Sequence, residues 1–174
     1  MDSGTGIFPH GKEVVMHQAY IASLCLIVLV LAILRWSSMA FAIKAEVCDP
    51  RATTFAFTAQ KTMYGGKHIA KGDTIFVFAS ENEGGQGLIA RGFVTSTEPI
   101  AKKSGIARQT PRVSLNIRRS ALAKRRLGRS ELKHFSDWND NQPETELNFK
   151  LYRQATNKIV GISDEAAAFL SEYF

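Results

Sequence analysis

The densest group of chemically similar side chains is a run of cations between residues 101 and 133. Eleven Lys and Arg residues lie there and only Glu131 opposes them, so this segment carries +10 in a chain whose net charge is +6. A solvated surface usually mixes both signs, whereas clustering of one sign is typical of a surface that binds a polyanion. Phosphates of RNA, DNA or anionic lipid are therefore the expected partners.

Aromatic residues follow the cationic segment. Rings beside Arg and Lys can stack on an unpaired base while the cations hold its phosphates. We expect Phe135 and Phe149 in the core, and Trp138 and Tyr152 exposed at the surface. The predicted nucleic-acid-binding residues are Arg112, Arg118, Arg119, Lys124, Arg125, Arg126, Arg129, Trp138 and Tyr152.

The familiar signatures of catalysis are missing from the sequence. It has no P-loop, no Gly-x-Gly-x-x-Gly after a strand and no Gly-x-Ser-x-Gly elbow. After residue 38, His68 and His134 each lack an acidic partner at metal-ligand spacing, so we expect no metal and no cofactor. Cys48 is the only thiol there, which excludes a disulfide or a cysteine-based zinc site within a monomer. Nothing in these patterns requires an enzyme.

Residues 14–36 raise a separate question, because Val14 to Leu34 is a stretch of 21 residues without Lys, Arg, Asp or Glu. About 20 apolar residues in a helix cross a hydrocarbon core of roughly 30 Å. As a membrane anchor, with Arg35 and Lys44 on its C-terminal side, the segment would place the following domain in the cytoplasm.

Two other interpretations of residues 1–38 stay open. Ala40-Phe41-Ala42 fits the cleavage pattern of a signal peptide, although Arg35 interrupts the stretch before it. Alternatively, Met39 is the true start of a cytoplasmic protein, and the residues before it come from a start site assigned too far upstream. The remaining 136 residues are enough for one domain with a sizeable core.

The elements expected after residue 38 alternate between short strands and short helices, without a βαβ series. Together they predict an α+β fold built on a small, mostly antiparallel barrel. We expect strands at 39–47, 74–79, 88–95, 112–117, 146–152 and 159–162. We expect short helices at 53–60, 120–127 and 130–134, and a last one capped by Ser163.

Several of these segments resemble the PUA-like superfamily, specifically its ASCH and EVE branches, over residues 39–174. The resemblance lies in four segments: Phe41-Ala42-Ile43, Lys71-Gly72-Asp73 with the strand after it, Gly87 to Gly92, and Glu146 to Arg153. It implies a PUA-like barrel with a pocket or groove for RNA or a modified base. Some ASCH-type proteins are amidohydrolases of modified nucleosides that use Lys, Thr and Glu. Lys61, Thr62 and Glu81 are the candidates for that alternative, and binding of anionic lipid by a membrane-attached domain is another.

Overall fold

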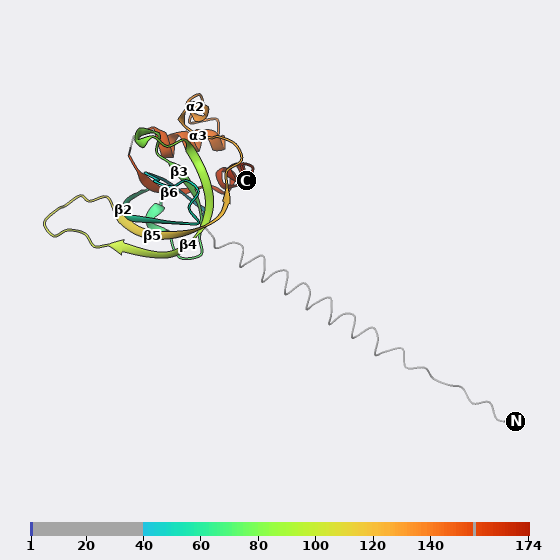
Figure 1. Ribbon diagram of the computed structural model, residues 1–174, viewed down its shortest axis with the longest axis horizontal. Helices are drawn as coiled ribbons and strands as arrows, with labels where there is room; N and C mark the ends of the chain where they lie inside the picture. Colours follow the sequence, from blue (N-terminus) through green and yellow to red (C-terminus); the bar gives the residue numbers. More distant parts are fainter. Residues whose placement is uncertain (2–39, 155) are drawn as a thin grey trace. The chain divides into compact units, whose positions relative to one another are not determined.

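Six strands form a closed barrel, in the order β1-β3-β4-β5-β2-β6. Figure 1 shows this barrel with most of its strands labelled. This computed structural model describes Met1, residues 40–154 and residues 156–174, so the apolar segment 14–36 and Met39 lie outside the described residues. No helix within the described residues is both long and apolar enough to cross a membrane. The strands are β1 (Ala40–Ala45), β2 (Thr54–Met63), β3 (Thr74–Ala79), β4 (Gly87–Ile100), β5 (Arg112–Leu122) and β6 (Lys158–Ile162).

The sheet is mixed, which refines the expectation of a mostly antiparallel barrel. β1 pairs with β3, and β2 with β6, in parallel, whereas the other four neighbouring pairs are antiparallel. β4 and β5 form the longest ladder, which continues to the pair Ile100 and Arg112. β4 thus extends beyond the expected strand 88–95 and includes Pro99, which lies at the exposed end of this two-stranded hairpin, where a missing hydrogen bond is tolerated.

Alternation of side chains along the strands creates two cores. In β1, Phe41 and Ile43 point into the barrel, where they pack with residues such as Ile75 and Leu115. Ala42, one residue away, points outward into a second buried cluster, which we call the outer core. The central strands therefore have both faces buried, which explains why β3 is a continuous apolar run.

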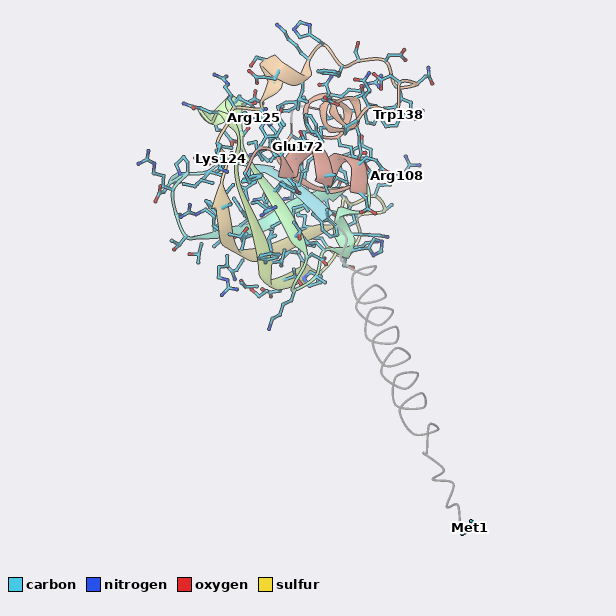
Figure 2. The ribbon with its side chains drawn as sticks, turned by 90° about the vertical axis from the view of Figure 1, so that its right-hand side faces the viewer. Met1, Arg108, Lys124, Arg125, Trp138 and Glu172 are labelled. Atoms are coloured by element: carbon cyan, nitrogen blue, oxygen red, sulfur yellow. The ribbon has the colours of Figure 1, made fainter. Side chains whose placement is uncertain are left out.

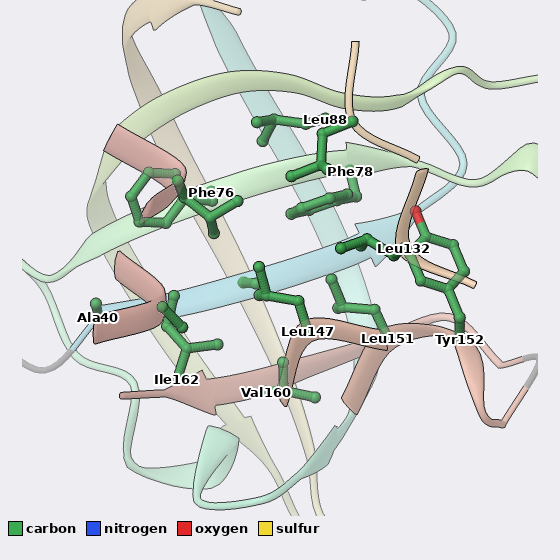
Figure 3. Packing of buried hydrophobic residues seen from close by; sticks show 14 residues of the cluster. Ala40, Phe76, Phe78, Leu88, Leu132, Leu147, Leu151, Tyr152, Val160 and Ile162 are labelled. Carbon is green, nitrogen blue, oxygen red and sulfur yellow. The ribbon is translucent and has the colours of Figure 1, made fainter. Parts of the chain in front are cut away.

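Short helices pack over the outer core and together form what we call the helical cover (Figure 3). They are α2 (Arg129–Leu132), α3 (Pro143–Leu147), the π-helical turn η3 (Asn148–Tyr152) and α4 (Asp164–Ser171). Leu132, Leu147 and Leu151 pack in this cluster with Phe76 and Phe78 of β3. As predicted, Ser163 caps α4, accepting a hydrogen bond from the Ala166 amide at 3.1 Å.

Three expected elements are wrong, and tertiary packing explains each. Residues 146–152 are helical rather than extended, because Leu147 and Leu151 are four residues apart and reach the same core. The expected helix 53–60 is instead strand β2 from residue 54 onward, where Phe55 and Phe57 alternate into the barrel. Instead of a helix at 120–127, β5 continues to Leu122 because it pairs with Ala90 of β4.

Two 3-10 turns complete the described fold. η1 (Gly66–His68) follows β2, and η2 (Glu81–Glu83) lies in the expected hairpin loop between β3 and β4. The amide of Ser80, just before η2, donates to the carbonyl of Ala45 at 2.8 Å, so η2 starts beside the end of β1. This places Glu81 next to the helices that cover the outer core.

Candidate functional site

A cavity of about 450 Å³ opens among α2, α3, η3 and the loop that follows α2. Aromatic rings and cations dominate its lining, and three polar side chains lie between them. The lining residues are Arg129, Lys133, Phe135, Ser136, Trp138, Thr145, Asn148, Phe149, Tyr152 and Arg153. The predicted residues Arg129, Trp138 and Tyr152 thus come together here, from segments that are separate in the sequence.

Trp138 and Phe149 form one wall of the cavity. Their ring centroids are 4.3 Å apart with the planes tilted by 46°, and the Arg153 guanidinium lies 4.8 Å from the Phe149 centroid. Trp138 keeps 54% of its surface exposed and lies at the surface of the molecule beside the helices (Figure 2). The prediction that Trp138 is exposed is confirmed. Its free face is available for stacking against a flat ligand.

Tyr152 was expected on the exposed face of a strand, and this expectation is wrong. The side chain is only 7% exposed, because the helical turn η3 directs it toward the outer core (Figure 3). Its hydroxyl donates a hydrogen bond of 2.9 Å to Oε1 of Glu81. Burial, followed by the nearby Glu81 carboxylate, raises the pKa of Tyr152 far above its usual value, so the phenol stays protonated and acts as a donor.

Glu81 links the loop η2 to the helical cover. Its Oε1 accepts the Tyr152 hydroxyl and also the backbone amide of Arg129 at 2.9 Å. A Cβ at Gly128 would lie 2.9 Å from the same oxygen, so glycine permits this close approach. The contact fixes the start of α2, and the Arg129 guanidinium is 5.6 Å from the Tyr152 ring centroid, on the cavity wall.

Two buried lysines lie near Tyr152. Lys44 of β1 and Lys158 of β6 are register partners in the antiparallel pair and have no exposed surface. Lys44 Nζ is 4.7 Å from the Tyr152 ring centroid, and Lys158 Nζ donates to the Gln154 carbonyl at 3.0 Å. Burial lowers the pKa of both amines, and the charge of Lys44 helps lower the pKa of Lys158 to about 8.

A second cavity of about 820 Å³ shares Trp138, Thr145 and Phe149 with the first. Its surroundings are acidic, since Asp140, Glu146 and Glu165 contribute to the lining. Burial alone would raise the pKa of Glu146, but hydrogen bonds from Lys150 and Ser163 outweigh it and hold the pKa below its usual value. A phosphate is therefore disfavoured in the second cavity, whereas the first presents three cations.

The other predicted cations are distributed along the barrel and do not line this cavity. Arg112 begins β5 and donates to the carbonyl of Ala59 at 2.6 Å. Arg118 and Arg119 follow on the same strand, where Arg118 is exposed and Arg119 half-buried. These three side chains are thus positioned by β5 rather than by the helical cover.

The last three predicted cations contact other parts of the chain. The Lys124 ammonium and the Arg125 guanidinium donate to the carbonyls of Phe174 and Glu172, at 2.8 and 3.1 Å (Figure 2). Arg126 lies 3.8 Å from the carboxylate of Glu131 in a surface ion pair. Lys124 and Arg125 therefore tie the end of β5 to the C-terminus.

The structure gives no support to the alternative catalytic set of Lys61, Thr62 and Glu81. The Thr62 hydroxyl donates to the carbonyl of Pro111 at 3.0 Å and is buried in that contact. Glu81 is instead engaged by Tyr152 and Arg129. Thr62 and Glu81 are thus held by different neighbours.

Several lining residues were missed or misplaced by the sequence argument. Phe135 and Phe149 were expected in the core, but both are only partly buried and line the cavity. Lys133 and Arg153 were not singled out for the site. For Arg153 alone the sequence holds a signal, because its spacing of four from Phe149 places both on one face if the segment is helical.

Several solved structures share the overall fold of this domain. Human THYN1, crystallised in complex with DNA containing 5-methylcytosine, matches with a TM-score of 0.54 at 13% identity, over 78% of this chain and 96% of the crystallised THYN1 chain. The DUF55 domain of human thymocyte nuclear protein 1 matches with a TM-score of 0.51 at 10% identity, over 76% and 96% of the two chains. The protein has the DUF55 fold.

The DUF55 fold confirms the predicted likeness to PUA-like, EVE-type domains at the level of architecture. A Pseudomonas putida protein shows the same fold, with a TM-score of 0.53 at 13% identity over 77% of this chain and 98% of its own. No protein-family model matches the sequence, and no curated protein matches it. The likeness therefore lies in the three-dimensional structure.

Proposed function

We propose that this DUF55-like domain binds nucleic acid and that the 450 Å³ cavity receives an unpaired or modified base of DNA or RNA. The observation that carries the proposal is the joint presence of four rings and three cations around one cavity. Rings can stack on any base, and cations beside them can hold the phosphates that the base carries with it.

Hydrogen bonds within the protein hold the polar lining of the cavity in place. The amide nitrogen of Asn148 donates to the Phe135 carbonyl at 2.8 Å, which fixes this side chain in the wall. The Thr145 hydroxyl donates to Asp140 at 2.8 Å and anchors the loop that carries Trp138. The cavity is therefore organised by contacts within the protein, which reduces the entropy cost of binding.

The THYN1 complex lends independent support. A protein with this fold and only 13% identity binds DNA that contains 5-methylcytosine. The DUF55 fold is thus compatible with nucleic-acid binding. A modified cytosine is accordingly the first base to test in the cavity.

The test measures binding of fluorescent DNA and RNA oligonucleotides, with cytosine or 5-methylcytosine, over a series of salt concentrations. Trp138→Ala should weaken binding by about 5- to 150-fold, because removal of base stacking costs about 1–3 kcal/mol. Phe93→Ala is the matched control, since Phe93 is an exposed ring on β4 with 42% of its surface accessible. The proposal fails if no oligonucleotide binds in a salt-sensitive manner, or if both variants lose affinity equally.

A further inference from the structure

A separate cationic cavity lies at the base of the β4–β5 hairpin, whose loop extends away from the barrel (Figure 1). Its volume is about 230 Å³. Four of its lining side chains are cations and none is a carboxylate: the lining residues are Lys61, Ile100, Ala101, Lys102, Lys103, Gln109, Thr110, Pro111 and Arg112. We call this site the hairpin cavity and the 450 Å³ site the base cavity. The two cavities share no lining residue.

Strand pairing forces like charges together at this cavity. Lys61 of β2 and Arg112 of β5 are direct register partners, an arrangement that repels and destabilises a sheet. The hydrogen bond from Arg112 to the Ala59 carbonyl holds the guanidinium in place. Neither ion pair found among the described residues involves a cation of this cavity. An anion bound here would relieve the repulsion.

The loop that supplies Lys102 and Lys103 is held in a defined shape. The side-chain amide of Gln109 accepts from the backbone amide of Lys103 at 2.9 Å and donates to its carbonyl at 2.6 Å. Gly105 makes the turn with φ of +80°. These hydrogen bonds fix the backbone of Lys103 next to Gln109 and to the strand ends.

We propose that the hairpin cavity binds a backbone phosphate of nucleic acid. Four cations without an opposing carboxylate match the charge of a phosphodiester, which Lys and Arg bind by charge-assisted hydrogen bonds. The choice of nucleic acid as the source of the phosphate rests on the proposed function. The hairpin then provides a second point of attachment to the same strand or duplex, away from the base cavity.

The experiment compares Lys102→Gln/Lys103→Gln with Lys67→Gln/Lys71→Gln, which removes two exposed lysines from another part of the surface. The full chain is titrated with a 5-methylcytosine DNA 20-mer over a series of salt concentrations. Lys102→Gln/Lys103→Gln, the hairpin variant, should reduce the magnitude of the negative slope of log affinity against log salt by roughly 0.7–0.9, the value for one phosphate that is no longer neutralised. The control variant should leave the slope unchanged, as should Trp138→Ala.

A second experiment uses the nucleotide 5-methylcytidine monophosphate, which is too small to occupy both cavities at once. A third experiment uses vesicles that contain phosphatidylserine. Nucleotide binding should be weakened by Trp138→Ala and unaffected by the hairpin variant. Equal slopes for the hairpin and control variants would overturn the inference while leaving the base cavity intact. The inference would be overturned in favour of a lipid phosphate if the protein bound vesicles through the hairpin lysines and did not bind DNA. The hairpin inference would be upheld and the base cavity refuted if the hairpin variant made the salt dependence shallower while Trp138→Ala left affinity unchanged.

Discussion

Tyr152 shows how one side chain can serve both the cavity and the core. Its ring lies near the Lys44 amine and the Arg129 guanidinium, at 4.7 and 5.6 Å from the centroid, and its hydroxyl is bound to Glu81. The electron-rich face of the ring partly compensates these cations for their reduced hydration. Tyr152 therefore connects Glu81 to the cavity wall that Tyr152 and Arg129 help to form.

Replacement of Tyr152 by Phe should destabilise the fold by about 1–3 kcal/mol, because the partly buried Glu81 carboxylate loses a hydrogen-bond donor. The ring, and with it the cavity wall, would remain. Tyr64→Phe is the matched control, since Tyr64 is 37% exposed and should change stability by no more than about 0.5 kcal/mol. Denaturant unfolding measures both. Equal stability of the two variants would show that the Tyr152 hydroxyl contributes nothing to the fold.

At the scale of elements, the pairing of β1 with β6 brings Lys44 and Lys158 together under the helical cover. Each buried ammonium loses hydration, and the two repel each other. The pKa of Lys158 falls from 10.5 to about 8 in consequence. The unfolded chain thus binds more protons than the folded protein between these two pH values, so stability rises with pH across this interval.

Lys158→Met should therefore stabilise the protein at pH 7, by an amount on the order of 1–3 kcal/mol, since each unit of pKa shift corresponds to about 1.4 kcal/mol. This gain in the free energy of unfolding should shrink above pH 8. It should vanish as the pH passes 10.5, where the amine becomes neutral in the folded and the unfolded protein alike. Thermal unfolding from pH 6 to 10.5 measures the effect, with the exposed Lys67→Met as the control. A gain that is independent of pH would contradict the titration argument.

The close approach of η1 to β6 makes another element-scale prediction. A Cβ on Gly66 would lie 2.3 Å from the Ile159 carbonyl oxygen, so Gly66→Ala must displace backbone from backbone. The neighbouring Gly65 has φ of +80° and open space around its Cβ direction, so Gly65→Ala incurs only conformational strain of about 1–2 kcal/mol. Chemical denaturation should show the larger destabilisation for Gly66→Ala. The reverse order would contradict the packing argument.

At the scale of the whole molecule, the C-terminus closes the outer core. The Lys124 amide donates to the Tyr173 carbonyl at 2.7 Å, and the Phe174 ring lies 6.0 Å from that of Phe76. The Arg125 guanidinium is 4.5 Å from the Tyr173 centroid. The last residues thus join β5, β3 and α4, which are distant in sequence.

Removal of residues 172–174 should lower the free energy of unfolding by about 2–4 kcal/mol, because apolar surface of Phe76 becomes exposed and the hydrogen bonds to Lys124 and Arg125 disappear. Glu172→Ala is the control, as it keeps the backbone carbonyl that Arg125 binds. Denaturant titration followed by circular dichroism measures the difference. A truncated chain as stable as the control would show that the C-terminal residues are dispensable for stability.

The sequence by itself determined the elements whose local signals agree with their packing. β3, β6 and the capped helix α4 were expected where they occur, because a short apolar run and a Ser cap each have a local physical cause. It also predicted the small barrel, the exposed Trp138 and the cationic segment, of which Lys102, Lys103 and Arg112 line the hairpin cavity.

Tertiary structure decided the rest. The block 146–152 alternates like a strand, yet it is helical because Leu147 and Leu151 are buried together against the outer face of the barrel. Sequence spacing could not reveal that Lys124 and Arg125 bind the C-terminus while Arg129, Lys133 and Arg153 converge on one cavity. The physical reason is that charge and polarity are local properties of a chain, whereas the partner of each side chain is chosen by contacts between segments far apart in it.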